Sequence, residues 1–165
     1  MKEFNFKIYY FVTVLCLSGF STSAQKTPEE LGRLAFEAFT KDTVVDISKL
    51  QSTFEEARLF TKKISLPFDS VGYYLRSEKL KKQAHIIKAY NEKGFNWVNA
   101  KLDTIIKTEF EFSLDWSKSD SRSVTLANII VYFSMGNRHF LLRLQDNPKI
   151  DQLWKLGGNI SFSEL

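Results

Sequence analysis

The chain has 165 residues, and its 23 Lys or Arg against 19 Asp or Glu give a formal net charge of +4 at pH 7. This small excess supports solubility and is far below the basic footprint of a nucleic-acid-binding domain, so we expect no nucleic-acid partner. One cysteine excludes an internal disulfide, and two histidines without an H-x-H or H-x-x-x-H spacing give no metal-binding pattern, so we expect no metal and no cofactor.

The first 24 residues have the pattern of a secretory signal peptide. Lys2 and Lys7 form a positive start, residues 8–20 are uncharged and mostly apolar, and residues 21–24 are small and end in Ala24. The apolar run is shorter than the roughly 20 residues that span a bilayer. We therefore predict cleavage after Ala24 and a periplasmic or secreted protein that does not contact the membrane once the signal is removed.

Lipidation of Cys16 is the alternative, and it would begin the mature chain at a lipid-modified cysteine. A small residue is expected before such a cysteine, whereas Leu15 stands there. The pattern favours the plain signal peptide.

Removal of these 24 residues from the 165 leaves 141, the size of one ordinary domain over residues 25–165. The mature chain then contains no cysteine, which excludes thiol nucleophiles as well as disulfides. Such a domain relies on its apolar core, and the 11 phenylalanines and three tryptophans of residues 25–165 can supply one.

Three helices are predicted from the first half of the mature chain. Thr27 and Glu30 form a capping box around Pro28, so a first helix begins there and runs to about Lys41. Asp46 can cap a second, and a 3.6-residue apolar period from residue 47 to residue 64 predicts one helix that ends before Pro67.

A third helix is predicted to begin at Ser77 and to end at Gly94, with a buried stripe of Leu80, Ala84, Ile87 and Tyr90. The aromatic stretch before it, residues 68–75, fits either a loop or a brief strand.

Four antiparallel strands are predicted from residue 98 onward. The alternation over residues 98–114 is longer than one usual strand, which indicates a bulge near Asp103 or a single long bent strand. Residues 124–135 are apolar on both faces and fit a central strand. Residues 138–145 alternate with Phe140, Leu142 and Leu144 on one side, a turn follows over residues 146–151, and residues 153–162 form the last strand, with Trp154 and Leu156 packed beneath the helices.

This order of elements resembles the cystatin-like α+β folds, in particular the nuclear-transport-factor-two-like superfamily and its small secreted bacterial members of unknown function. The resemblance is carried by the strand at residues 140–144, the turn after it, and residues 153–160, which match the closing pattern W-K-L-x-G-x-I. It implies two to three N-terminal helices packed on a curved four-stranded antiparallel sheet, with a cone-shaped cavity. Relatives use that cavity as an enzyme pocket or to bind ligands or partners.

The enzymes of that superfamily work by acid–base chemistry with Asp, His and Tyr in the cone. The candidates for a pocket here are Asp69, Tyr73, Tyr74 and His85, and further along the chain Asp103 and His139. Each also fits a turn, a packing position or a solvated face, and no two of them stand at a spacing that assembles a catalytic dyad. We therefore expect no catalytic residues, and treat the first four as ligand-binding candidates.

The opposite face of the sheet is the other candidate surface. With Phe140 on the helix side, we expect four apolar residues on the outer face: Ile105, Tyr132, Leu141 and Leu153. They suit contact with an unknown partner protein or a second copy of the chain, and scattered surface apolars are an equally ordinary reading. The sequence thus predicts an exported, non-catalytic domain that binds a protein or a small apolar ligand. The alternative is a small cone-pocket hydrolase, isomerase or dehydratase.

Overall fold

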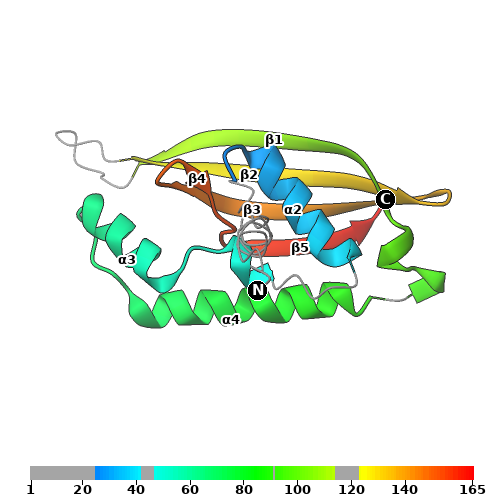
Figure 1. The fold of residues 1–165 in the computed structure, drawn as a ribbon, viewed down its shortest axis with the longest axis horizontal. Coiled ribbons are helices and arrows are strands. Elements are labelled where there is room, and N and C mark those ends of the chain that lie inside the picture. The colour runs from blue at the N-terminus through cyan, green and yellow to red at the C-terminus, as the bar shows by residue number, and fades with distance from the viewer. Residues whose placement is uncertain (1–24, 42–46, 91, 114–122) are drawn as a thin grey trace, which may run out of the picture.

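The computed structural model describes residues 25–41, 47–90, 92–113 and 123–165, in which three α-helices precede a curled antiparallel sheet (Figure 1). The predicted α+β class is confirmed, as is the order of helices before strands. The signal peptide, its cleavage site and the alternative at Cys16 lie outside the described residues, and so does Asp46.

Helix α2 (Pro28–Thr40) begins where the sequence predicts. The side chain of Thr27 accepts a hydrogen bond from the backbone N–H of Glu30, and Glu30 accepts one from the backbone N–H of Thr27, which completes the capping box. Lys88 donates a hydrogen bond to the carbonyl of Phe39 at the other end of α2. The apolar face of α2 packs on β1 and β2.

The predicted second helix is wrong in one respect, because it is two pieces rather than one. A single 3₁₀ turn covers Ile47–Leu50, and α3 (Phe54–Lys63) starts again after residues 51–53. Thr53 and Glu56 form a second capping box, so the chain contains a helix start inside the apolar period. Helix α3 ends at Lys63, followed by Ser65 with φ +56°, before Pro67 is reached.

Helix α4 (Ser70–Lys88) begins seven residues before the predicted cap at Ser77. Asp69 is the N-cap, and its Oδ1 accepts a hydrogen bond of 2.9 Å from the backbone N–H of Gly72. Most of the stretch that fitted a loop or a strand, residues 70–75, therefore belongs to the first two turns of a helix. The predicted stripe of Leu80, Ala84 and Ile87 is buried, but the helix ends at Lys88 and not at Gly94.

The sheet contains β1 (Lys101–Ser113), β2 (Ser123–Met135) and β3 (Arg138–Ile150) in that order, with β2 in the predicted central place. The far edge of β3 pairs with two short strands, β4 (Leu153–Trp154) and β5 (Asn159–Glu164), so the predicted last strand is divided. The register of β1 against β2 shifts between Leu102 and Thr104, which confirms a bulge at Asp103.

The predicted turn at residues 146–151 is wrong, because β3 continues through them to Ile150. Asp146 has φ +54° where the pairing of β2 with β3 shifts register, so it bends the strand without ending it. The chain reverses at Asp151 and Gln152, both with positive φ, as a two-residue hairpin turn of type I′ requires.

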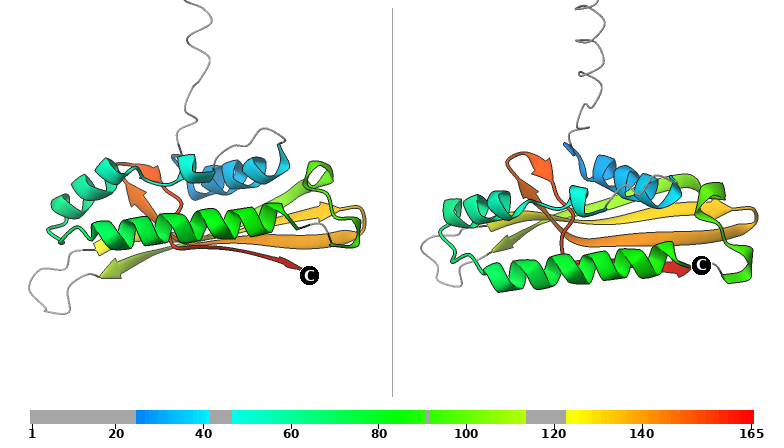
Figure 2. Two further views of the ribbon diagram at one scale, coloured as in Figure 1. Left: turned by 90° about the horizontal axis from the view of Figure 1, so that it is seen from below. Right: turned by 60° about the horizontal axis from the view of Figure 1, so that its bottom comes forward.

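All three helices lie on the same side of the sheet (Figure 2). The buried side chains between the layers include Phe140, Leu142 and Leu144, together with Trp154 and Leu156, as the alternation predicts. Among the described residues, no helix is both long enough and apolar enough to cross a membrane.

Candidate functional site

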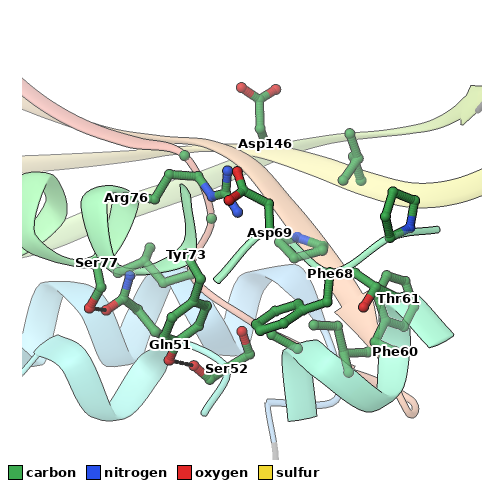
Figure 3. Close-up of a pocket in the computed structure, with 18 residues that line it drawn as sticks. Gln51, Ser52, Phe60, Thr61, Phe68, Asp69, Tyr73, Arg76, Ser77 and Asp146 are labelled. Atoms are coloured by element: carbon green, nitrogen blue, oxygen red, sulfur yellow. Dashed lines mark hydrogen bonds between the residues drawn. The ribbon is translucent and has the colours of Figure 1, made fainter. Parts of the chain in front are cut away.

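A cavity of about 480 Å³ lies where α3 and the first turns of α4 meet the strongly bent end of β3 (Figure 3). Its volume falls within the range of ordinary small-molecule sites, roughly 300–1,000 Å³. The cavity exists because the chain breaks between the 3₁₀ turn and α3 and because β3 bends at Asp146, so the helices and the sheet end do not close on one another.

One wall of the cavity is apolar. Two of its residues come from α3, two from the connection to α4, and the others from the sheet and the segment after β4. This wall consists of Ala57, Phe60, Pro67, Phe68, Leu126, Pro148, Ile150 and Leu156. A ligand's apolar part would be removed from water against it, which is the main source of binding free energy in such sites.

A carboxylate and a guanidinium stand side by side on the α4 wall. Asp69 and Arg76 are seven residues apart, two turns of one helix, and both side chains extend over Gly72 (Figure 3). A Cβ at Gly72 would lie 2.0 Å from Asp69 Oδ2 and 3.1 Å from Arg76 Nη1, so the missing side chain leaves room for both groups. Within the described residues Arg76 forms no hydrogen bond or ion pair, and Oδ2 of Asp69 accepts none. The carboxylate of Asp146, the third charged group of the lining, points away from this pair (Figure 3).

Four of the uncharged polar residues of the lining are joined in pairs by hydrogen bonds. Tyr73 donates from its hydroxyl to the carbonyl of Ser52 at 2.9 Å, and Ser77 donates to Oε1 of Gln51 at 3.1 Å. Burial raises the pKa of Tyr73, and the nearby Tyr74 and Glu56 raise it further, so its hydroxyl stays protonated and a hydrogen-bond donor at neutral pH. These bonds tie α4 to the break before α3 and fix the shape of the cavity.

The structure brings two of the four predicted pocket residues into this cavity, Asp69 and Tyr73. Tyr74 belongs instead to an aromatic cluster, with its ring stacked on Phe54 at 5.6 Å, and lines a neighbouring hollow. His85 is exposed near the end of α4 and does not line the cavity. Arg76 was missed, because a helix started at Ser77 separates it from Asp69; a start at Asp69 places the two on one face.

The structure also brings Asp103 and His139 together, which their spacing did not predict. Oδ2 of Asp103 lies 3.9 Å from Nδ1 of His139, and Ser134 donates to Oδ1 of Asp103 at 2.8 Å. The distance of 3.9 Å is too long for a hydrogen bond, and both side chains are open to solvent.

The predicted outer-face residues divide into two groups. Tyr132 is half-buried on the outer face, and Leu153 is half-buried in β4. Ile105 is wrongly placed by the prediction: its Cγ2 lies beside Gly32 of α2, on the helix side, since the bulge at Asp103 changes the alternation of β1. Leu141 is only 3% exposed, because its neighbours across the strands, Tyr132 and Ser163, cover it. The expected free surface at Leu141 is therefore also a wrong prediction.

Other apolar side chains occupy the outer face instead. Ile106 and Phe112 of β1 are half-exposed, and they alternate with Ile105, which points to the helices. None of the described helices covers this face (Figure 2). Among the described residues there is also no group of three His, Cys, Asp or Glu side chains arranged to hold a metal ion.

Comparison of the chain with protein-family models, with curated proteins and with solved structures gave no match in any of the three. The function is therefore argued from the site alone.

Proposed function

We propose that this protein is an exported, non-catalytic ligand-binding domain whose working site is the cavity between α3, α4 and the bent end of β3. The observation that carries the proposal is the composition of that cavity. Its lining combines eight apolar residues with a carboxylate and a guanidinium, and neither of these two charged groups forms an ion pair among the described residues. A few convergent polar groups on an apolar background are the usual form of a small-molecule site.

The alternative of an acid–base enzyme has less support from the same geometry. A general acid or base must be free to exchange a proton with the substrate. Asp69 already caps α4 through Oδ1, the hydroxyl of Tyr73 is directed to the carbonyl of Ser52, and His85 lies outside the cavity. Asp69 and Tyr73 thus stabilise the local fold through hydrogen bonds, and this arrangement suits ligand binding better than proton transfer.

The proposal is tested with a reporter dye and a filled cavity. The anionic dye 1-anilinonaphthalene-8-sulfonate should bind the folded mature protein at one site, because the apolar wall removes its rings from water. Thr61→Trp places a large side chain in the cavity and should abolish that site, whereas Lys62→Trp, on the neighbouring exposed position of α3, should preserve it. Thermal melts confirm that both variants fold. Absence of a saturable dye site in the wild type, or equal binding by both variants, contradicts the proposal.

A second candidate function is association with a partner protein or a second copy through the outer face of the sheet. It is favoured by Ile106, which pairs with Ile130 two residues from Tyr132, and by Phe112 further along β1. Both Ile106 and Phe112 are half-exposed on a face that the described helices leave open. Ile106→Glu should then reduce association measured by sedimentation without loss of folding, because an unpaired carboxylate in an apolar contact is costly. A wild-type protein that sediments as a monomer at high concentration argues against the dimer.

We propose two further properties together with this function. Export is supported by the signal-peptide pattern of residues 1–24, and an intact mass that begins at Gln25, or at pyroglutamate formed from it, is the expected result. Distant membership of the nuclear-transport-factor-two-like superfamily is supported by the order of helices before a curled antiparallel sheet.

A further inference from the structure

The charged pair of the cavity restricts which ligand the site accepts. A ligand with a lone carboxylate would meet Arg76 but would also approach Asp69, and a ligand with a lone ammonium would meet the reverse problem. A Cβ at Gly72 would lie 2.0 Å from Oδ2 of Asp69 and 3.1 Å from Nη1 of Arg76, so these two charged atoms are no more than about 5 Å apart. Each single charge is therefore attracted and repelled at nearly the same distance.

A ligand with both charges on neighbouring atoms resolves this conflict. An ammonium group donates to Oδ2 of Asp69 while an adjacent carboxylate accepts from Arg76, and both contacts are charge-assisted hydrogen bonds. Both charged side chains line the cavity. Among the described residues, Asp69 accepts a hydrogen bond only through Oδ1, from the N–H of Gly72, so its Oδ2 and the guanidinium of Arg76 are left for a ligand. In a peptide the two terminal charges are separated by at least one peptide unit, so a free α-amino acid fits the pair better.

The apolar wall then selects the side chain of that amino acid. Phe60 and Phe68 face the cavity on one side and Pro148 and Ile150 on another, so a branched or aromatic side chain would be shielded from water. A polar side chain would lose hydration against this wall, and the hydroxyls of Tyr73 and Ser77 already donate to other groups.

The geometry points to a free apolar α-amino acid as the ligand, with its ammonium on Asp69, its carboxylate on Arg76 and its side chain against the apolar wall. This inference rests on the proposed function, because it names the ligand class of the same cavity.

The test is titration calorimetry of the mature protein with L-leucine and three analogues that each change one feature. N-acetyl-L-leucine lacks the positive charge, L-leucinamide lacks the negative charge, and L-leucyl-L-leucine moves the charges apart. Each analogue should bind at least about tenfold more weakly than L-leucine, the loss expected for one charge-assisted hydrogen bond.

Two variants assign the charges to their residues. Asp69→Asn keeps a good helix cap and removes the negative charge, so L-leucine should bind about tenfold more weakly, whereas N-acetyl-L-leucine should bind no worse than before. Arg76→Gln should weaken L-leucine to a similar extent and spare L-leucinamide. Lys79→Gln, an exposed cation on the next turn of α4 that does not line the cavity, is the matched control and should leave all affinities unchanged.

The possible results distinguish the amino-acid inference from the proposed ligand-binding function. A protein that binds the reporter dye in the cavity but not L-leucine keeps the proposed function and overturns the amino-acid inference. A protein that binds neither overturns both. Binding of L-leucine that is unaffected by Asp69→Asn and Arg76→Gln also overturns the inference, because the contacts then lie elsewhere.

Discussion

Lys155 is a nearly buried cation, and its partner Glu56 gives the most direct test of how α3 is held to the sheet. The ammonium of Lys155 lies 3.0 Å from Oε1 of Glu56, with the side chain of Lys155 only 11% exposed and that of Glu56 37% exposed. Oε2 of Glu56 accepts a hydrogen bond from the backbone N–H of Thr53 and so completes the capping box of α3. One carboxylate therefore joins a helix start to the segment between β4 and β5.

Glu56→Gln removes the charge and keeps the cap, because glutamine serves as well as glutamate at this position of a capping box. The buried ammonium of Lys155 then has no counter-charge. Loss of one partner of a fully buried pair costs about 3–5 kcal/mol, but Glu56 is partly solvated and the amide can still accept a hydrogen bond. We expect Glu56→Gln to lower the free energy of unfolding at pH 7 by about 1–2 kcal/mol.

Lys155→Met is the matched control. It removes the cation that needs a partner, keeps most of the apolar stem, and leaves Glu56 with solvent and the N–H of Thr53. We expect the free energy of unfolding to change by less than about 1 kcal/mol.

The pair also predicts how stability depends on pH. Burial alone would raise the pKa of Glu56, but the hydrogen bonds from Thr53 and Lys155 and the charge of Lys155 outweigh it and hold the pKa below its usual value of 4.5. A carboxyl group with a lowered pKa in the folded state stabilises the protein above its unfolded pKa, and this contribution is lost as the pH falls through the folded pKa. Wild type should therefore lose more stability than Glu56→Gln when the pH is lowered from 7 to below 4.5.

Urea denaturation followed by tryptophan fluorescence measures both effects. For a domain of this size the slope is about 1–3 kcal/mol per molar urea, so the expected loss moves the midpoint by roughly 0.5–1 M. Equal midpoints for wild type and Glu56→Gln at pH 7, or a larger loss in Lys155→Met, would refute the reasoning.

Three further changes test the packing of the sheet by the same urea method. Trp154→Ala empties a buried core position and should cost about 3–5 kcal/mol, whereas a loss below about 1 kcal/mol contradicts its place in the core. Leu141→Glu buries a carboxylate at a covered position and should lower the free energy of unfolding by about 3 kcal/mol or more. His139→Ala, at an exposed position on the same strand face, should change it by less than about 0.5 kcal/mol. Similar stabilities of the two variants would mean that Leu141 is open to solvent. Gly157→Ala should destabilise the protein, because its Cβ would lie 1.8 Å from the carbonyl oxygen of Asp146. Gly158→Ala should not, because its Cβ would lie 3.5 Å from the nearest atom. Equal tolerance of both substitutions contradicts the close approach at Gly157.

The sequence predicts the parts of the fold that depend on regular alternation. Phe140, Leu142 and Leu144 alternate along β3 and are buried as expected, and the capping box at Thr27 begins α2. These signals are local, because the pleat and the first helical turn each involve only a few neighbouring residues.

The errors come from signals that compete at the same place. The apolar period over residues 47–64 predicted one helix, although Thr53 and Glu56 form a capping box inside it. Asp69 and Ser77 can both cap a helix, and the aromatic contacts of Phe54 with Phe68 and Tyr73 stabilise the earlier start. Such contacts join residues that the sequence separates by about 14 to 19 positions, so local patterning does not include them. Arg76 was missed as a site residue for the same reason.

The irregular positions of the fold are also the positions that make the cavity. A helix unbroken through residues 51–53 would carry side chains across the space that the cavity occupies, and a turn at residues 146–151 would end β3 before Pro148 and Ile150 reach the apolar wall. Gly157 allows the chain after β4 to pass against the backbone of Asp146, which closes the cavity on the side of the sheet. The bulge at Asp146 and the second capping box therefore have the same effect. Each interrupts a regular strand or helix that would otherwise occupy the space of the cavity. The cavity and the errors of prediction thus have the same structural origin.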